Sequence, residues 1–310
     1  ADKAEKMATG VTKYEFQPVN GGELPEWQAG AHLDIVVAPE YLRQYSMSGD
    51  PGDRSTYQIG VLMEDAGRGG SKLLHRIFSE GRRVFISNPI NHFPLDRDAP
   101  FSLLMGGGIG ITPMIAIAHE LHRAGRDFAL HFSGRSRATM GYLDDLAAMP
   151  WADKVHLHVT DEDTRADLPT LMAGLPAGAH VYTCGAERYM SAVVAAAEAA
   201  GVPEEARHLE YFTVPEVPEY ENFEFTLRLA RSGHEIQVPA DKSATDVLAE
   251  NGIHVDVKCA DGICGVCKCG LVAGEVEHRD FVLSRAQRQE AVILCQSRAA
   301  KPGGVVEVDL

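Results

Sequence analysis

The most constraining feature of this chain is a run of cysteines near its C-terminus. Cys259, Cys264 and Cys267 follow the spacing C-x4-C-x2-C, and a fourth cysteine, Cys295, stands well apart from them. This is the spacing of a plant-type [2Fe–2S] cluster, in which four thiolates hold two irons. Two glycines within the run allow the backbone to curl around the inorganic sulfurs. The pattern therefore predicts a chain that transfers electrons one at a time.

Other interpretations of the cysteines are weaker. A structural zinc site usually shows two paired knuckles, whereas here the fourth ligand stands alone. Disulfides are disfavoured because six cysteines in 310 residues are few and because we recognise no export sequence. In an extended segment Cys269 would lie on the same side as Cys267, so alternation alone leaves it open as a ligand. The spacing favours Cys267, and we interpret Cys269 as a small buried residue.

Length and composition indicate an ordinary globular chain of two or three domains. It has 310 residues, of which 45% are hydrophobic and 24% are charged. A net charge of −15 with no basic stripe argues against nucleic acid as a partner. The apolar runs are too short to span a bilayer, which argues against a membrane partner. We expect a cytoplasmic protein with reduced thiols that is a monomer when free.

Residues 1–98 are predicted to form a small β-barrel domain. Segments over 12–17, 31–38, 43–48 and 55–63 alternate in polarity or are rich in β-branched residues, and turn residues separate them. Several short strands at regular spacing are typical of a barrel or sandwich.

Residues 99–214 change period and are predicted to form an α/β domain. Apolar strands alternate with helical segments, which implies a parallel sheet with helices on both faces. The expected strands are 101–105, 128–132, 155–159 and 180–184, and the expected helices include 114–123 and 188–200.

A linker and a third domain follow. Residues 215–222 are predicted to be the linker, because two prolines and three glutamates within 213–222 keep that stretch extended and solvated. Residues 223–310 carry the cysteines on a β-grasp-like pattern. Two strands precede a helix whose start has the capping-box residues Ser243 and Asp246.

A glycine-rich loop in the second domain is predicted to bind a pyrophosphate. Gly106, Gly107, Gly108 and Gly110 follow an expected strand and precede an expected helix. Glycines there let backbone N–H groups approach phosphate at the positive helix terminus. Pro113 suits the first helical turn, where a missing N–H costs nothing. The motif differs from the Rossmann fingerprint, because Pro113 replaces its last glycine.

A second strand of the same sheet ends in small residues, Cys184 and Gly185. Small side chains at this edge would leave room for a nicotinamide ring. Taken alone, Cys184 is better interpreted as a buried core thiol. Another strand end carries Arg135 and Arg137, whose charges suit the 2′-phosphate of NADPH.

The first domain carries two candidate flavin motifs. One is a strand bearing Arg43, Gln44, Tyr45 and Ser46, in which the first and third residues share one face. The other is the loop at 67–71, which enters an expected helix over 72–78. Its Arg68, its backbone N–H groups at Gly69 and Gly70, its Ser71 and the helix dipole would together hold a phosphate.

In this order, the motifs R-x-Y-S, G-R-G-G-S, G-G-G-I-G-I-T-P, C-G and C-x4-C-x2-C…C resemble the phthalate dioxygenase reductase family. The wider group comprises FMN-containing reductases of Rieske oxygenases, including vanillate demethylase reductases. The resemblance covers essentially the whole chain. It implies a multidomain α/β plus β protein with a flavin-binding β-barrel, a ferredoxin-reductase-type NAD-binding domain and a C-terminal β-grasp [2Fe–2S] ferredoxin domain.

The resemblance also implies residue roles. Thr112 would lie between flavin and nicotinamide, Cys184 would lie near the transferred hydride, and Phe212 would cover the flavin ring. Tyr211 is a departure from the family pattern to which we assign no role. The further flavin contacts implied are Arg43, Gln44, Tyr45, Ser46, Gly60, Val61 and Leu62, with Arg68, Gly69, Gly70 and Ser71 at the phosphate.

The implied function is electron transfer from NADH through FMN and the [2Fe–2S] cluster to a terminal Rieske-type aromatic-ring oxygenase. One alternative is an FAD- or NADPH-dependent ferredoxin-reductase-type protein that serves another monooxygenase or demethylase. Another is a redox-sensing module, which would not need complete flavin and nicotinamide sites. The oxygenase substrate is bound by another protein, so this sequence does not name it.

Overall fold

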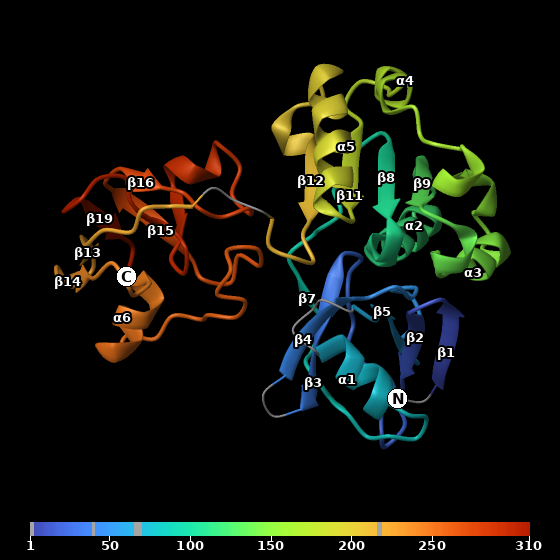
Figure 1. The fold of residues 1–310 in the computed structure, drawn as a ribbon, viewed down its shortest axis with the longest axis horizontal. Coiled ribbons are helices and arrows are strands. Elements are labelled where there is room, and N and C mark those ends of the chain that lie inside the picture. Colours follow the sequence, from blue (N-terminus) through green and yellow to red (C-terminus); the bar gives the residue numbers. More distant parts are fainter. Residues whose placement is uncertain (1–2, 39–40, 65–69, 216–218) are drawn as a thin grey trace. The chain divides into compact units, whose positions relative to one another are not determined.

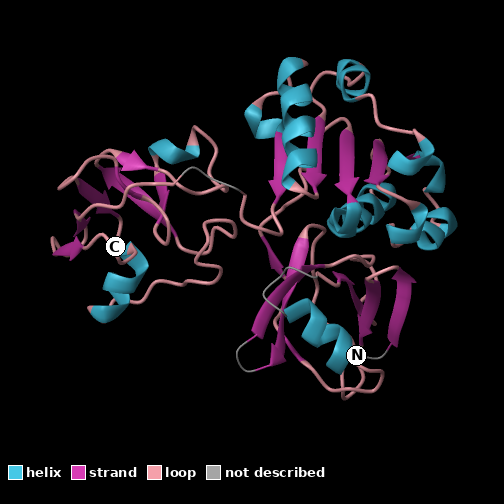
Figure 2. Ribbon diagram, viewed as in Figure 1, coloured by secondary structure: helices cyan, strands magenta, loops and turns pink. Residues whose placement is uncertain are grey.

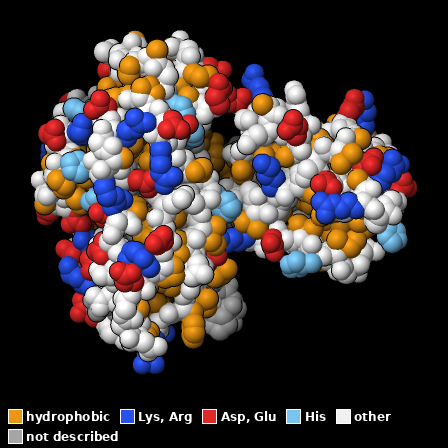
Figure 3. Space-filling view, turned by 180° about the vertical axis from the view of Figure 1, so that it is seen from behind, with side chains coloured by type: hydrophobic (Ala, Val, Ile, Leu, Met, Phe, Trp, Pro, Cys, Tyr) orange, Lys and Arg blue, Asp and Glu red, His pale blue; other side chains and the backbone are white. Residues whose placement is uncertain are grey.

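The computed structural model describes residues 3–38, 41–64, 70–215 and 219–310. The chain divides into two compact units, Ala1–Phe212 and Thr213–Leu310. The sequence boundary proposed at residue 98 therefore lies inside the first unit, and the proposed linker lies at the start of the second. No helix among the described residues is long and apolar enough to cross a membrane. Acidic and basic side chains are interspersed over the face shown in Figure 3.

The first part of unit 1 consists of two antiparallel sheets. The isolated bridge between Met47 and Ile59 connects them, and they form the expected barrel, whose sheets are not closed among the described residues. Alternation along one central strand buries Leu33, Ile35 and Val37 in the core. One sheet consists of β1 (Lys3–Ala8), β2 (Val11–Phe16) and β5 (Tyr57–Leu62). The other consists of β4 (Tyr41–Ser46), β3 (Ala31–Ala38) and β6 (Phe85–Ile86), and β7 (Ile90–Asn91) also pairs with β3. Helix α1 (Gly70–Ile77) lies beside them (Figure 1).

The second part of unit 1 is a five-stranded parallel sheet covered by helices, which confirms the predicted βαβ pattern (Figure 2). Its strand order is β10-β9-β8-β11-β12. The helices are α2 (Ile111–Arg123), α3 (Leu143–Ala148), α4 (Leu168–Ala173) and α5 (Glu187–Ala199), and the strands are β8 (Ser102–Gly107), β9 (Phe128–Gly134), β10 (Val155–Val159), β11 (His180–Cys184) and β12 (Arg207–Glu210).

The strand order of this sheet fixes where a ligand can bind. From β8 the chain first builds outward to β9 and β10, and it then returns to place β11 on the other side of β8. Ligands of open α/β sheets bind outside the carboxyl ends of the strands at such a switch point. The glycine-rich loop follows β8, and Gly185 follows β11. Both segments therefore lie at the switch point.

Unit 2 is a mixed sheet with one principal helix, as expected for a β-grasp domain. Helix α6 (Ala244–Glu250) begins with the predicted capping box, in which Ser243 and Asp246 each bond the other's backbone N–H. The sheet order is β14 (Glu235–Val238), β13 (Phe225–Leu229), β19 (Val305–Val308), β15 (Lys268–Ala273) and β17 (Ala291–Ile293), with a separate pair β16 (Val276–Glu277) and β18 (Arg298–Ala299).

A buried tyrosine joins the two parts of unit 1. Tyr142 is 1% exposed and adopts φ 68°, a left-handed conformation that is rare for a bulky residue. Its hydroxyl lies 2.9 Å from the Ser48 hydroxyl, with which it forms a hydrogen bond. Close by, the nearly buried Lys13 forms a 2.7 Å ion pair with Asp145. These bonds hold the parallel sheet and its helices against strand β2 and the chain after β4.

We expect Tyr142→Phe and Ser48→Ala each to lower the free energy of unfolding of unit 1 by about 1 kcal/mol, because each leaves one buried hydroxyl without its partner. The double variant should cost clearly less than the sum of the two single changes. Urea unfolding followed by tryptophan fluorescence measures the cycle, because both tryptophans, Trp27 and Trp151, lie in unit 1. Strict additivity would show that the two hydroxyls do not interact.

Candidate cofactor sites

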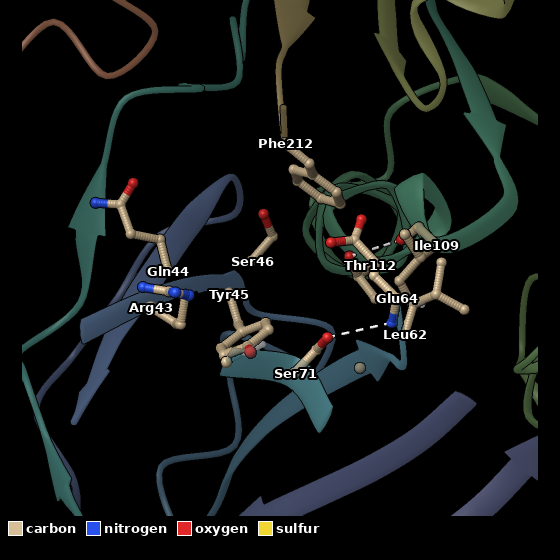
Figure 4. A pocket seen from close by; sticks show the side chains of 12 residues that line it. Arg43, Gln44, Tyr45, Ser46, Leu62, Glu64, Ser71, Ile109, Thr112 and Phe212 are labelled. Carbon is tan, nitrogen blue, oxygen red and sulfur yellow. Dashed lines mark hydrogen bonds between the residues drawn. The ribbon is translucent and has the colours of Figure 1, made fainter. Parts of the chain in front are cut away.

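A pocket lies where β4, β5 and the start of α2 meet (Figure 4). It is a cavity of about 140 Å³ that opens to solvent, so a cofactor bound here would be partly exposed. Ten of the twelve lining residues are flavin contacts expected from the sequence, and Glu64 and Ile109 are additional. The ten are Arg43, Gln44, Tyr45, Ser46, Gly60, Leu62, Gly70, Ser71, Thr112 and Phe212.

One described residue among the expected flavin contacts, Val61, does not line this pocket. Val61 is fully buried, because alternation along β5 turns its side chain into the core while Gly60 and Leu62 face the pocket. Its backbone remains on the pocket strand. Arg68 and Gly69 lie outside the described residues.

Two glycines give the pocket its walls. A Cβ on Gly60 would lie 2.5 Å from the Tyr142 hydroxyl and 2.8 Å from Cγ2 of Thr112, so β5 approaches α2 this closely only without a side chain. A Cβ on Gly70 would lie 2.5 Å from Nε of Arg43. The guanidinium of Arg43 therefore packs over the start of α1, where the positive helix terminus also favours an anion.

Aromatic rings reach the pocket from two sides. Figure 4 shows Phe212 entering from one side and Tyr45 from the other. Phe212 remains 39% exposed, and burial raises the pKa of Tyr45 to about 12, so its phenol stays neutral. A planar aromatic cofactor would stack favourably here. Hydroxyls add directional contacts: Thr112 donates to the Ile109 carbonyl at 3.1 Å, and Ser71 accepts from the Glu64 amide at 3.2 Å.

Glu210 is a site residue that the sequence analysis missed. The Ser46 hydroxyl donates to its carboxylate at 2.9 Å, and burial raises the pKa of Glu210 to about 8. Glu210 and Cys184 are register partners on β12 and β11. A carboxyl that exchanges its proton near neutral pH therefore lies one hydrogen bond from a pocket-lining hydroxyl. Its position two residues before Phe212 was the available clue.

Cys184 is placed in the core. Its thiol is fully buried, and burial, followed by the charge of Glu210, raises its pKa well above the ordinary value. The thiol is therefore neutral and unreactive by itself. Cys184 ends β11 directly beside Gly106 of β8, so its position at the switch point agrees with the expectation. What it does there for a nicotinamide stays a prediction.

The glycine-rich loop serves packing as well as ligand approach. A Cβ on Gly110 would lie 2.2 Å from the Cys184 carbonyl oxygen, and one on Gly107 would lie 2.7 Å from the Tyr189 ring. Gly106 and Gly185 are also confined by neighbouring backbone. Gly108 differs from these four glycines, because it has φ of +55° and open space where a side chain would stand. Its backbone is the part of the loop that a pyrophosphate can approach.

In unit 2 the four expected ligands form two pairs of thiols. The thiol of Cys264 bonds Cys259, and the thiol of Cys295 bonds Cys267. These bonds lower the pKa of Cys259 to about 5 and that of Cys267 to about 7. Backbone amides also point at sulfur, including that of Asp261 at 3.3 Å from Cys259. In each pair one thiol is therefore favoured as the thiolate, while the same hydrogen bond raises the pKa of its partner, Cys264 or Cys295.

This arrangement fits a binuclear centre. In a [2Fe–2S] cluster each iron takes only two protein thiolates, and bridging sulfides complete its coordination. Two pairs of thiols supply this set. The loop between them turns at Gly262 and Gly265, which have φ of +75° and +74°.

Cys269 lies in a different place from the four. It belongs to the main core of unit 2, with Phe225 and Val306, whereas Cys267 and Cys295 pack with Leu283 in a separate small cluster. Its sulfur lies 3.8 Å from the Asp309 carbonyl oxygen. Alternation would place Cys267 and Cys269 on the same side only if both lay in one strand, but β15 begins at Lys268.

Known proteins resemble the chain over nearly its whole length. Residues 227–300 match the family model described as a 2Fe-2S iron-sulfur cluster binding domain. The chain is 38% identical over 297 residues to vanillate O-demethylase oxidoreductase of Pseudomonas sp. (strain HR199 / DSM 7063), covering 94% of each chain. The solved phthalate dioxygenase reductase superposes with a TM-score of 0.70 at 34% identity, covering 100% of this chain and 96% of that one.

A larger protein also contains this architecture. An intact type IV self-sufficient cytochrome P450 monooxygenase superposes with a TM-score of 0.87 at 36% identity. The match covers all of this chain but only 40% of that one. The chain therefore spans less than half of that protein.

We expect Cys269→Ala to keep the visible and EPR spectra of the iron–sulfur centre, because its thiol lies in another core cluster. Cys267→Ala should abolish them, because one iron loses one of its two thiolates. Iron content and EPR of the two purified variants make a matched comparison. Loss of the centre in Cys269→Ala but not in Cys267→Ala would reverse the assignment.

Glu210 should make stability depend on pH. Between about pH 4.5 and pH 8 the folded state keeps a proton that the unfolded state releases, so this group lowers the free energy of unfolding as pH rises. Glu210→Gln removes the effect. Relative to wild type, the free energy of unfolding of the variant should rise by about 3 kcal/mol between pH 5 and pH 8.

Denaturant unfolding at several pH values measures this difference. Glu205→Gln is the control, because it neutralises an exposed carboxylate just before strand β12. The free energy of unfolding of this variant should depend on pH as that of wild type does. If the free energy of unfolding depended on pH equally in wild type and in Glu210→Gln, the raised pKa of Glu210 would be contradicted.

Proposed function

The chain belongs to the phthalate dioxygenase reductase family of oxygenase reductases, and we propose that it passes electrons from NADH to a terminal Rieske-type oxygenase. It is an oxidoreductase, and its second unit is a [2Fe–2S] domain. The match to phthalate dioxygenase reductase supports FMN and NADH as its other cofactors.

The observation that carries the proposal is the presence of two different sites in one chain. Unit 1 has a pocket with aromatic and hydroxyl walls beside a dinucleotide-type switch point. Unit 2 has two pairs of thiols suited to a binuclear iron centre. A bound flavin accepts the electron pair of a nicotinamide and gives electrons up singly, and a [2Fe–2S] centre carries one. A redox sensor would not need the first site.

We assign the flavin as FMN because its terminal phosphate would meet the start of α1. Gly70 and Ser71 begin this helix, its first turn carries no acidic residue, and Arg43 packs over it. Arg68 and Gly69, just before the helix, complete the proposed phosphate site. Ring contacts are assigned to the pocket side chains of Tyr45, Ser46, Thr112 and Phe212 and to the backbone of Gly60, Val61 and Leu62.

We place NADH at the switch point, with its pyrophosphate at the loop of Gly106, Gly107, Gly108 and Gly110 and its nicotinamide near Cys184 and Gly185. In this assignment the buried Cys184 limits where the ring can lie, and Thr112 separates it from the flavin. The hydroxyl of Thr112 is already held by the Ile109 carbonyl, so its methyl group faces the pocket side of α2.

The proposed partner is a separate Rieske oxygenase. A haem monooxygenase is a second candidate acceptor, because the self-sufficient cytochrome P450 chain superposes on this one with the higher TM-score. The proposed cell compartment is the cytoplasm, and the proposed free state is a monomer. The three-domain division at 98, 214 and 222 is likewise a proposal.

Cys295→Ala tests the electron path. The variant should lose the iron–sulfur centre but keep flavin, because its pocket lies in the other unit. Anaerobic NADH should still bleach the flavin at close to the wild-type rate, while reduction of cytochrome c falls at least tenfold. Extraction should yield FMN. Cytochrome c reduction at the wild-type rate, or extraction of FAD, would contradict the proposal.

Acceptor identity needs a second measurement. Reconstitution with a purified Rieske oxygenase and, separately, with a cytochrome P450 haem domain should give NADH-dependent product only with the first. Product only with the second would replace the proposed partner and leave the internal electron path intact.

A further inference from the structure

Three neighbouring strands end together beside the proposed NADH site. Gly107 of β8 is the register partner of Ser133 on β9, and Gly134 is the register partner of Val159 on β10. All three strands are parallel, so the segments that follow them lie at one edge of the sheet. The edge therefore runs from the glycine-rich loop, through 135–137, to the turn Thr160–Glu162.

An ion pair bridges the second and third of these segments. Arg137 donates to Glu162 with both ends of its fork, Nε to Oε1 at 2.7 Å and Nη2 to Oε2 at 3.1 Å. The backbone also joins the segments, since the Asp161 amide donates to the Arg135 carbonyl at 2.9 Å. The guanidinium face that would match a phosphate is thus already occupied by a carboxylate.

The position of this pair matches the ribose end of a dinucleotide. In doubly wound sheets the strand after the glycine-rich helix ends beside the adenosine ribose, where an acid accepts the 2′-hydroxyl of NAD and an arginine binds the 2′-phosphate of NADP. Here that strand is β9, and it is followed by Arg135, Ser136 and Arg137 with no acid of its own. The acid comes from the next strand end instead, as Glu162.

Formal charges at this edge oppose a phosphate. The segment that carries Arg135 and Arg137 is joined to one that carries three consecutive acids, Asp161, Glu162 and Asp163, and these five residues sum to one negative charge. A 2′-phosphate would add about two more, and like charges in contact are destabilising. A ribose 2′-hydroxyl adds none and can donate to a carboxylate.

We propose that the Glu162–Arg137 pair is the specificity determinant that selects NADH over NADPH. The carboxylate of Glu162 repels the 2′-phosphate, and it also withholds the guanidinium of Arg137 from that phosphate. The inference rests on the proposed NADH site. Rejection built from a like charge is a common route to specificity. Both side chains are about half exposed, at 54% and 43%, so the pair adds little to stability and its variants should fold.

Glu162→Gln keeps the size of the side chain and removes its charge. The ratio of kcat/KM for NADPH to that for NADH should rise about tenfold or more, which corresponds to about 1.4 kcal/mol. The kcat/KM for NADH should change less than threefold. Calorimetry with 2′,5′-ADP and ADP, which needs no flavin chemistry, should show the same shift toward the 2′-phosphate.

Two further variants distinguish the effect of the Glu162–Arg137 ion pair from the effect of removing any negative charge nearby. Asp163→Asn removes a charge one residue away, and asparagine tolerates the left-handed φ of 55° there. This control should shift the ratio less than threefold. Adding Arg137→Gln to Glu162→Gln should cancel most of the rise in the NADPH-to-NADH ratio, because the Arg137 guanidinium, once free of Glu162, is the group that binds the phosphate.

The opposing outcomes are distinct. A wild-type preference for NADPH, an unchanged ratio in Glu162→Gln, an equal shift in Asp163→Asn, or a gain that Arg137→Gln leaves undiminished would each overturn this specificity mechanism. Failure of the proposed function looks different. In that case the wild-type protein oxidises neither nucleotide.

Discussion

The first unit depends on the close approach of strand β5 to the start of helix α2. At Gly60 the strand meets Thr112 and the strained, buried Tyr142 at distances that leave no room for a Cβ. The Tyr142–Ser48 hydrogen bond holds this contact, and the pocket opens along the same strand at Gly60 and Leu62. Packing between the antiparallel sheets and the parallel sheet thus decides the shape of the cofactor site.

The two cofactor environments are built on separate hydrophobic cores, one in each unit. The pocket of unit 1 is built on the large core that contains Tyr142 and Cys184. The thiols of Cys267 and Cys295 pack in a small cluster of their own in unit 2. Each cofactor environment can therefore be changed without dismantling the other. This suits a protein that exchanges an electron pair at one site and single electrons at another.

Features written in short contiguous motifs were predictable from the sequence. The cysteine spacing, the capping box at Ser243 and the strands at 31–38, 155–159 and 180–184 have the expected positions. Each depends on local spacing or alternation, which sequence alone displays. The pocket residues were predicted through the family resemblance, because their convergence from distant strands leaves no local pattern.

What the sequence missed depends on contacts across the fold. Glu210 gains its raised pKa from burial beside Ser46, which is 164 positions away along the chain. Glu162 matters because β10 ends beside β9, which only the strand order reveals. The bridge between Met47 and Ile59 joins the two sheets of the barrel in the described part of the chain, and no local sequence pattern displays this pairing. The short strand β6 and helix α3 carry too few residues to show a period.

One chain collects electron pairs from NADH and stores them on two different centres. An anaerobic titration of the purified protein with dithionite, followed by visible absorbance and EPR, measures this storage. We expect uptake of about three electron equivalents per chain, two at the flavin and one at the [2Fe–2S] centre. Substoichiometric NADH should then produce the EPR signal of the reduced cluster. Uptake of only about two equivalents, with no such signal, would contradict it.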